Sequence, residues 1–185
     1  MGAEGADAEE APASLIAVVY ETVLVNHAVK DFMLRLILGA LLFAFAASAS
    51  ADGRLYPEVS KAKADIATAL KEAAATKRRV IVDFGGDWCT DCKILDINLR
   101  KPENAQLVQK YYVVVHVNVG DKGITDNHDV AERYGIPLQK GVPALAVLES
   151  DGRLVYSQKQ GEFESMRSMD PQSVTVFLRK WARTE

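Results

Sequence analysis

The residues best suited to chemistry are Cys89 and Cys92, the only two cysteines in a chain of 185 residues. They stand in the run Trp88-Cys89-Thr90-Asp91-Cys92-Lys93, where an apolar, β-branched segment gives way to a predicted helix. Unpaired backbone N–H groups and the helix dipole at that end favour a thiolate at Cys89. Cys92 lies one turn further on and can attack a mixed disulfide formed at Cys89. The spacing therefore predicts an exposed nucleophile and a sheltered resolving thiol.

A carboxyl group precedes this pair by six positions. Asp83 follows the β-branched residues of the run Arg79–Phe84 (RVIVDF), which is otherwise apolar after its first residue. A buried carboxylate near Cys92 could act through a water as the base that deprotonates the resolving thiol. The alternative is an aspartate at a strand end whose oxygens accept bonds from backbone donors. We favour the catalytic interpretation because both cysteines follow so closely.

The elements around these residues alternate between helix and strand. Helices are predicted over 57–77, 88–100 and 103–110, with a short one ending near 134–135 and a last one that has Asp170 as its cap and Pro171 at its first position. Strands are predicted over 79–84, 112–119, 144–148 and 154–156, the last two as a hairpin. This order indicates an α/β fold with a central mixed β-sheet flanked by helices on both faces.

Residues 33–51 are typical of a secretory signal peptide. A basic residue precedes the apolar stretch Leu36–Ala47, and the small residues Ala49 and Ala51 suit a signal peptidase. The stretch is shorter than the roughly 20 residues of a membrane-spanning helix. We therefore expect cleavage near Ala51 and a periplasmic protein. A membrane anchor facing the periplasm is the alternative.

The acidic excess of the chain lies in its first 51 residues. The formal net charge is −3, yet that segment holds six acidic and two basic residues, so the remainder is nearly neutral. We interpret residues 1–32 as a non-native or disordered extension, with translation beginning at Met33. The pI of 5.7 argues against a nucleic-acid binder, and two cysteines are too few for a disulfide scaffold.

The run VDFGGDWCTDCK, residues 82–93, resembles the active-site segment of the thioredoxin superfamily. Both show a strand, an acid and Trp-Cys-x-x-Cys-Lys in the same order and spacing. A second marker is Gly141-Val142-Pro143, just before the predicted strand at 144–148. The resemblance covers residues 57–183. It implies a thioredoxin fold for a single domain over 52–185.

The same resemblance implies roles for further residues. Pro143 would be a cis-proline that faces the dithiol, and Val142 would offer backbone hydrogen bonds to an extended substrate. Apart from the resemblance, we expect Trp88 to pack beside the dithiol and shield it. The charge of Lys93 would offset part of the acidic charge there, and the alternative is a solvated lysine on a helix face. Two stretches, 137–140 and 120–127, look longer than in a plain thioredoxin, and both flank the place where a substrate would dock.

A reducing role is the direction we expect. Only 51 positions separate Cys92 from Pro143, which leaves no room for the helical domain that exported oxidants of this superfamily insert there. Asp87 and Asp91 place negative charge near Cys89 and disfavour its thiolate, whereas strong oxidants stabilise it. The likeness is greatest to small exported reductase modules, such as the C-terminal domain of the transmembrane disulfide reductant conductor.

This resemblance implies no cofactor beyond a redox-active Cys89–Cys92 disulfide. Expected partners are disulfide-bearing proteins and a membrane electron donor that restores the dithiol, with no nucleic acid, and we expect a monomer. A zinc site needs about four ligands, so we expect no metal and interpret His116 and His128 as core or surface residues. The alternatives are a non-catalytic module that binds partners and a weak disulfide oxidase or isomerase.

Overall fold

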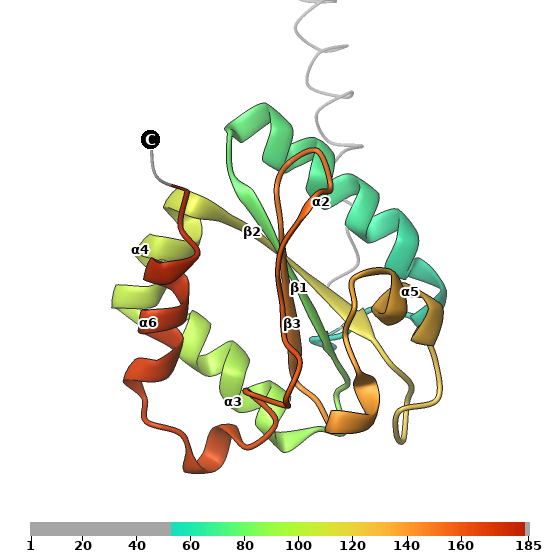
Figure 1. Cartoon of the computed structure of the whole chain (residues 1–185). Coiled ribbons are helices and arrows are strands. Elements are labelled where there is room, and N and C mark those ends of the chain that lie inside the picture. Colours follow the sequence, from blue (N-terminus) through green and yellow to red (C-terminus); the bar gives the residue numbers. More distant parts are fainter. Residues whose placement is uncertain (1–52, 184–185) are drawn as a thin grey trace, which may run out of the picture. The chain divides into compact units, whose positions relative to one another are not determined.

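The computed structural model describes residues 53–183 (Figure 1). Four strands make a single mixed sheet in the order β2-β1-β3-β4. The strands are β1 (Arg79–Gly85), β2 (Tyr112–Asn118), β3 (Ala144–Leu148) and β4 (Leu154–Ser157). Strand β1 pairs parallel with β2 and antiparallel with β3, and β3 pairs antiparallel with β4. The predicted central mixed sheet is confirmed.

Helices cover both faces of this sheet, as predicted (Figure 1). The α-helices are α2 (Ala62–Thr76), α3 (Thr90–Leu99), α4 (Pro102–Tyr111), α5 (His128–Arg133) and α6 (Gln172–Lys180). Three short 3₁₀ helices are η1 (Val59–Lys61), η2 (Leu138–Lys140) and η3 (Met166–Ser168). One buried cluster joins α2 and α5 to the sheet, and the other joins α3 and α6 to the opposite face.

Alternation along the two parallel strands, β1 and β2, explains these layers. Val80, Val82 and Phe84 of β1 face the α2 side, whereas Ile81 faces the α3 side. Each strand residue points opposite to its neighbours, so Asp83 shares the side of Ile81. The parallel register places Asp83 directly beside His116 of β2. The sheet therefore presents a carboxyl and an imidazole on one face, near the beginning of α3.

Two predicted helices begin clearly later than expected. The helix expected over 57–77 begins at Ala62, because the segment before it folds along the edge strand β2 and Asn118 donates a hydrogen bond to the Pro57 carbonyl. The helix expected over 88–100 begins at Thr90, because Cys89 has an extended backbone and caps it. The last helix, α6, begins at Gln172 with Pro171 as its N-cap, one residue later than predicted, although the Asp170 carboxylate does accept the Gln172 N–H.

The predicted signal peptide, 33–51, and the extension, 1–32, lie outside the described residues. Within 53–183, no helix has the length and apolar character needed to cross a bilayer.

Candidate active site

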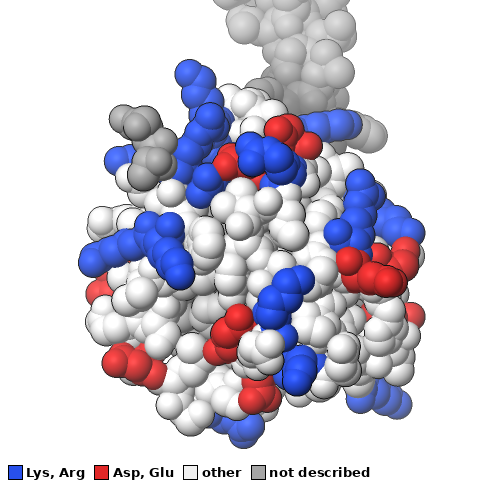
Figure 2. Space-filling view, in the orientation of Figure 1, with Lys and Arg blue, Asp and Glu red and all other residues white. Residues whose placement is uncertain are grey.

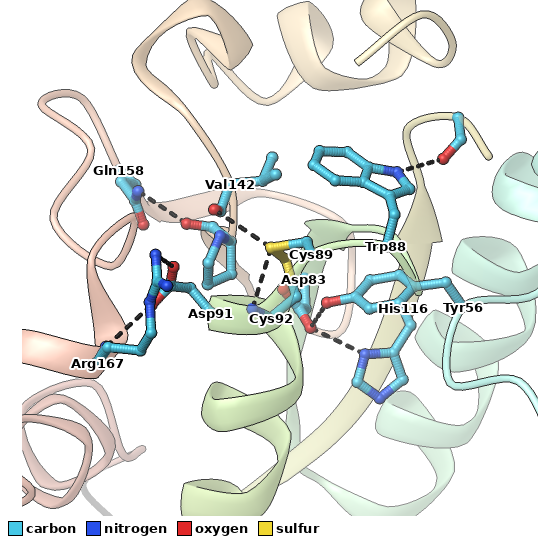
Figure 3. Close-up of a disulfide and its surroundings, with 12 residues drawn as sticks. Tyr56, Asp83, Trp88, Cys89, Asp91, Cys92, His116, Val142, Gln158 and Arg167 are labelled. Atoms are coloured by element: carbon cyan, nitrogen blue, oxygen red, sulfur yellow. Dashed lines mark hydrogen bonds and ion pairs between the residues drawn. A yellow bond between two sulfur atoms is a disulfide. The ribbon is translucent and has the colours of Figure 1, made fainter. Parts of the chain in front are cut away.

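Cys89 and Cys92 are joined by a disulfide at the beginning of α3 (Figure 3). Cys89 is the N-cap residue, and its Sγ accepts the backbone N–H of Cys92 at 3.1 Å. That N–H has no intrahelical partner, so it stabilises negative charge on the same sulfur once the disulfide is opened. The geometry suits a thiolate at Cys89, as the spacing indicates.

The cysteines are covered more completely than we expected. Cys92 is fully buried, as predicted, but Cys89 is only 6% exposed rather than an open nucleophile. The carbonyl oxygen of Val142, which is itself buried, lies 3.5 Å from Cys89 Sγ. The Val142–Pro143 bond is cis. One of the two residues predicted to meet substrate therefore contacts the disulfide.

A buried amide holds the Pro143 segment in place. Gln158, which follows β4, donates from Nε2 to the Pro143 carbonyl at 3.2 Å. Its Oε1 accepts the backbone N–H of Leu145 at 3.1 Å. Because Pro143 and Leu145 satisfy both ends of one fully buried amide, Gln158 fixes the beginning of β3 relative to β4.

Asp83 lies buried beneath the disulfide and has two side-chain partners (Figure 3). Its Oδ2 accepts the Tyr56 hydroxyl at 2.7 Å and the His116 Nδ1–H at 2.9 Å. Its Oδ1 has no hydrogen-bond partner among the described residues. The carboxyl therefore has one oxygen held by two donors and one oxygen available to accept a proton.

A glycine brings this cluster up to the resolving cysteine. A Cβ on Gly85 would stand 2.4 Å from the Tyr56 hydroxyl and 2.8 Å from Cys92 Sγ. The hydroxyl and the sulfur therefore both occupy the space that a side chain at position 85 would need. Gly85 is required here for close approach rather than for backbone conformation, since its φ is not positive.

The two side chains that donate hydrogen bonds to Asp83, His116 and Tyr56, both have raised pKa values. Burial alone would lower the pKa of His116, and this is the largest single effect. The hydrogen bond and negative charge of Asp83, with the charge of Asp96, outweigh it and raise the pKa above 6.5. Burial and then the Asp83 charge raise the pKa of the Tyr56 hydroxyl, so it stays protonated and donates.

The acidic residues near Cys89, which were expected to disfavour its thiolate, are bound to other groups. The Asp91 carboxylate is 3.1 Å from an Arg167 guanidinium nitrogen and also accepts the Arg167 backbone N–H at 2.9 Å. Asp87 accepts the backbone N–H groups of Leu55 and Tyr56. These partners reduce the negative potential at the sulfur, so charge is a weaker argument for a reducing dithiol than we expected.

Trp88 and Lys93, the other predicted site residues, lie in sequence on either side of the two cysteines. Trp88 is 40% exposed, and its indole N–H donates to the Gly120 carbonyl at 2.7 Å (Figure 3). This bond ties the indole to the long stretch 120–127. Lys93 lies exposed on α3, just after Cys92. Trp88 therefore borders the disulfide as a fixed apolar surface, and Lys93 is a solvated cation.

Similar known proteins show the family to which this chain belongs. Residues 61–150 match a family described as thioredoxin-like. A thioredoxin from Buchnera aphidicola subsp. Schizaphis graminum is 33% identical over 100 residues, which are 54% of this chain and 82% of that protein. The chain belongs to the thioredoxin-like family.

Two further similarities concern disulfide chemistry in this thioredoxin-like family. The crystal structure of a disulphide isomerase from Xylella fastidiosa Temecula1 matches with a TM-score of 0.63 and 36% identity, covering 68% of this chain and 95% of that one. The thiol:disulfide interchange protein DsbD of Neisseria meningitidis serogroup A is 30% identical over 111 residues, which are 58% of this chain. Those residues make up only 17% of that protein.

Four residues of this thioredoxin-like site were missed in the sequence. His116 was interpreted as a core or surface histidine, whereas it binds Asp83; Tyr56, Gln158 and Arg167 were not singled out. The sequence did hold a signal for His116. Asp83 and His116 are each the fifth residue of one of two parallel strands, and residues at equal positions in paired parallel strands lie side by side. Tyr56 and Gln158 lie outside the helices and strands, and Arg167 lies in the three-residue helix η3, so no periodicity predicts which of these side chains turns inward.

Proposed function

We propose that this protein reduces disulfide bonds in other proteins through Cys89 and Cys92. The observation that carries the proposal is the capped Cys89 lying against the cis Val142–Pro143 segment with Cys92 buried behind it. The Cys89 thiolate attacks a substrate disulfide and forms a mixed disulfide, releasing one substrate thiolate. Cys92 then attacks Cys89 Sγ, which releases the second substrate thiolate and leaves the Cys89–Cys92 disulfide.

The proposed direction rests on the compact connection between the dithiol and Pro143. The chain runs from α3 through α4, β2, α5 and η2 to β3 with no inserted helical domain.

The surface around the fold carries acidic and basic side chains interspersed with uncharged patches, as Figure 2 shows for one face. Such a surface suits a range of partners better than one strongly charged partner.

The proposed setting is the periplasm, with a membrane-bound dithiol donor. An oxidising compartment does not regenerate a dithiol, so each turnover needs two electrons from such a donor. The predicted signal peptide and the similarity to part of DsbD support this setting. The proposed cycle therefore passes electrons from a membrane dithiol to Cys89–Cys92 and then to an exported protein.

Disulfide isomerisation is the second candidate, because the similar Xylella structure is described as a disulphide isomerase. Isomerisation needs the Cys89 mixed disulfide to persist until another substrate thiol displaces it. The site favours resolution instead, because Cys92 lies one helical turn away with Asp83 behind it.

Insulin reduction tests the proposal. With dithiothreitol as the electron source, we expect the protein to speed the precipitation of insulin chains well above the rate with dithiothreitol alone. The Cys89→Ser variant should give only that background rate. A wild-type protein that leaves the background unchanged would contradict reductase activity and favour the partner-binding alternative. Refolding of scrambled ribonuclease without net reduction would instead support the isomerase.

A further inference from the structure

His116 connects the buried carboxyl of Asp83 with solvent. Its Nδ1 faces Asp83 Oδ2, and its ring packs edge-on against Tyr56 with centroids 5.2 Å apart (Figure 3). The other side of the residue lines a cleft of about 440 Å³ between α3, α4 and β2. The side chain is 19% exposed, whereas the Asp83 side chain has no exposed surface. Of the two, the imidazole is the group that can exchange a proton with water.

We propose that His116 releases a compensating proton into this cleft when Asp83 takes the proton of Cys92. The inference rests on the proposed function, because it concerns the step in which Cys92 resolves the mixed disulfide. In this role His116 is a positioning residue that acts through Asp83. It contacts neither the cysteines nor the substrate in the described structure.

The protons balance over the step. Cys92 gives its proton to the unpartnered Oδ1 of Asp83, directly or through a water, and becomes a thiolate. The His116 imidazolium then faces a neutral carboxyl and loses its Nε2 proton to solvent. Cys92 attacks Cys89 Sγ, a new sulfur–sulfur bond forms, and the substrate leaves as a thiolate. After the substrate has left, Nε2 of His116 takes a proton back from solvent and Asp83 gives its proton to water, so the net result is one proton from Cys92 to solvent.

Charges on the neighbouring elements permit this exchange. Asp83 of β1 and the Tyr56 hydroxyl face one side of the imidazole, and Asp96 and Arg100 of α3 line the cleft on the other. Asp96 and Arg100 form an ion pair at 2.9 Å, so their charges largely cancel at the ring. The α4 side of the cleft contributes Ala105, Val108 and Gln109, none of which titrates. Asp83 is thus the dominant charge on His116.

A reaction with 5,5′-dithiobis(2-nitrobenzoate) isolates the step. The reduced protein should release two equivalents of coloured thiolate, the first when Cys89 attacks and the second when Cys92 resolves. We expect His116→Gln to leave the first phase unchanged and to slow the second about tenfold. Because the pKa of His116 is raised, imidazolium is present below that pKa and lost above it. The ratio of the wild-type to the His116→Gln second-phase rate should therefore fall towards one as the pH rises through the pKa of His116.

Exposed His128 provides the matched control, since His128→Gln removes an imidazole without touching Asp83. An NMR titration of the His116 ring gives a second readout that needs no substrate. We expect a pKa above 6.5 in the wild type and a lower one in Asp83→Asn, where burial is no longer opposed by the carboxylate. Unchanged second-phase kinetics in a folded His116→Gln, or equal pKa values in the two proteins, would overturn the proposal. A wild type with no coloured release would count against the proposed function instead.

Discussion

The Cys92→Ala variant should accumulate a covalent complex with disulfide-bearing proteins, held at Cys89. Cys89 keeps its position as the N-cap of α3 and can still attack, but no thiol remains to displace the captured partner. Turnover in the insulin assay should fall to background, while the variant gains one partner per molecule. Non-reducing gels and peptide mapping of the complex measure both the yield and the attachment site.

The companion variant Cys89→Ser removes the attacking sulfur and keeps Cys92. It should form no complex, because Cys92 is completely buried behind the segment that contains Val142 and Pro143. Complexes attached at Cys92 would contradict the assignment of the nucleophile. The absence of any complex with Cys92→Ala in a periplasmic extract would favour a binding module without catalysis.

Replacing Asp83 by asparagine should slow turnover by about a hundredfold or more, the usual contribution of a general base. The amide has nearly the same shape but cannot accept the proton of Cys92. Attack by Cys89 does not depend on Asp83, so the Cys89 mixed disulfide should persist for longer in this variant. Quenching the insulin reaction with acid at successive times measures the persistence of that intermediate.

The exposed Asp151 supplies the control for this change, because it lies in the turn between β3 and β4. Asp151→Asn makes the same chemical substitution and should leave turnover at the wild-type rate. Circular dichroism of both variants distinguishes a slow step from a failure to fold. Wild-type turnover in a folded Asp83→Asn would show that the carboxyl is structural.

Most of the fold that could be predicted from the sequence was predicted from its helices and strands. The β-branched run before Cys89 and the alternating run at 112–119 predicted the two parallel strands of the sheet, β1 and β2. Hydrophobic spacing likewise predicted the helices that cover the sheet. The order of elements then allowed few topologies, because parallel connections need a crossover helix.

The contacts around Asp83 and Asp91 show where prediction ended. Asp91 was expected to disfavour the Cys89 thiolate, yet Arg167 lies against it from a segment that is 76 positions away. Tyr56 enters the site from the irregular stretch before α2, where no periodic pattern shows which side chain turns inward. Such contacts depend on how distant segments pack, so they follow from the assembled fold rather than from local spacing.

Equilibration with glutathione redox buffers tests the central claim, a reducing Cys89–Cys92 dithiol, most directly. Alkylation after an acid quench, followed by mass measurement, gives the fraction of molecules with both cysteines reduced at each ratio. We predict a reduction potential closer to the roughly −270 mV of thioredoxin than to the roughly −120 mV of DsbA. A potential close to the DsbA value would contradict the claim and assign the protein to disulfide formation.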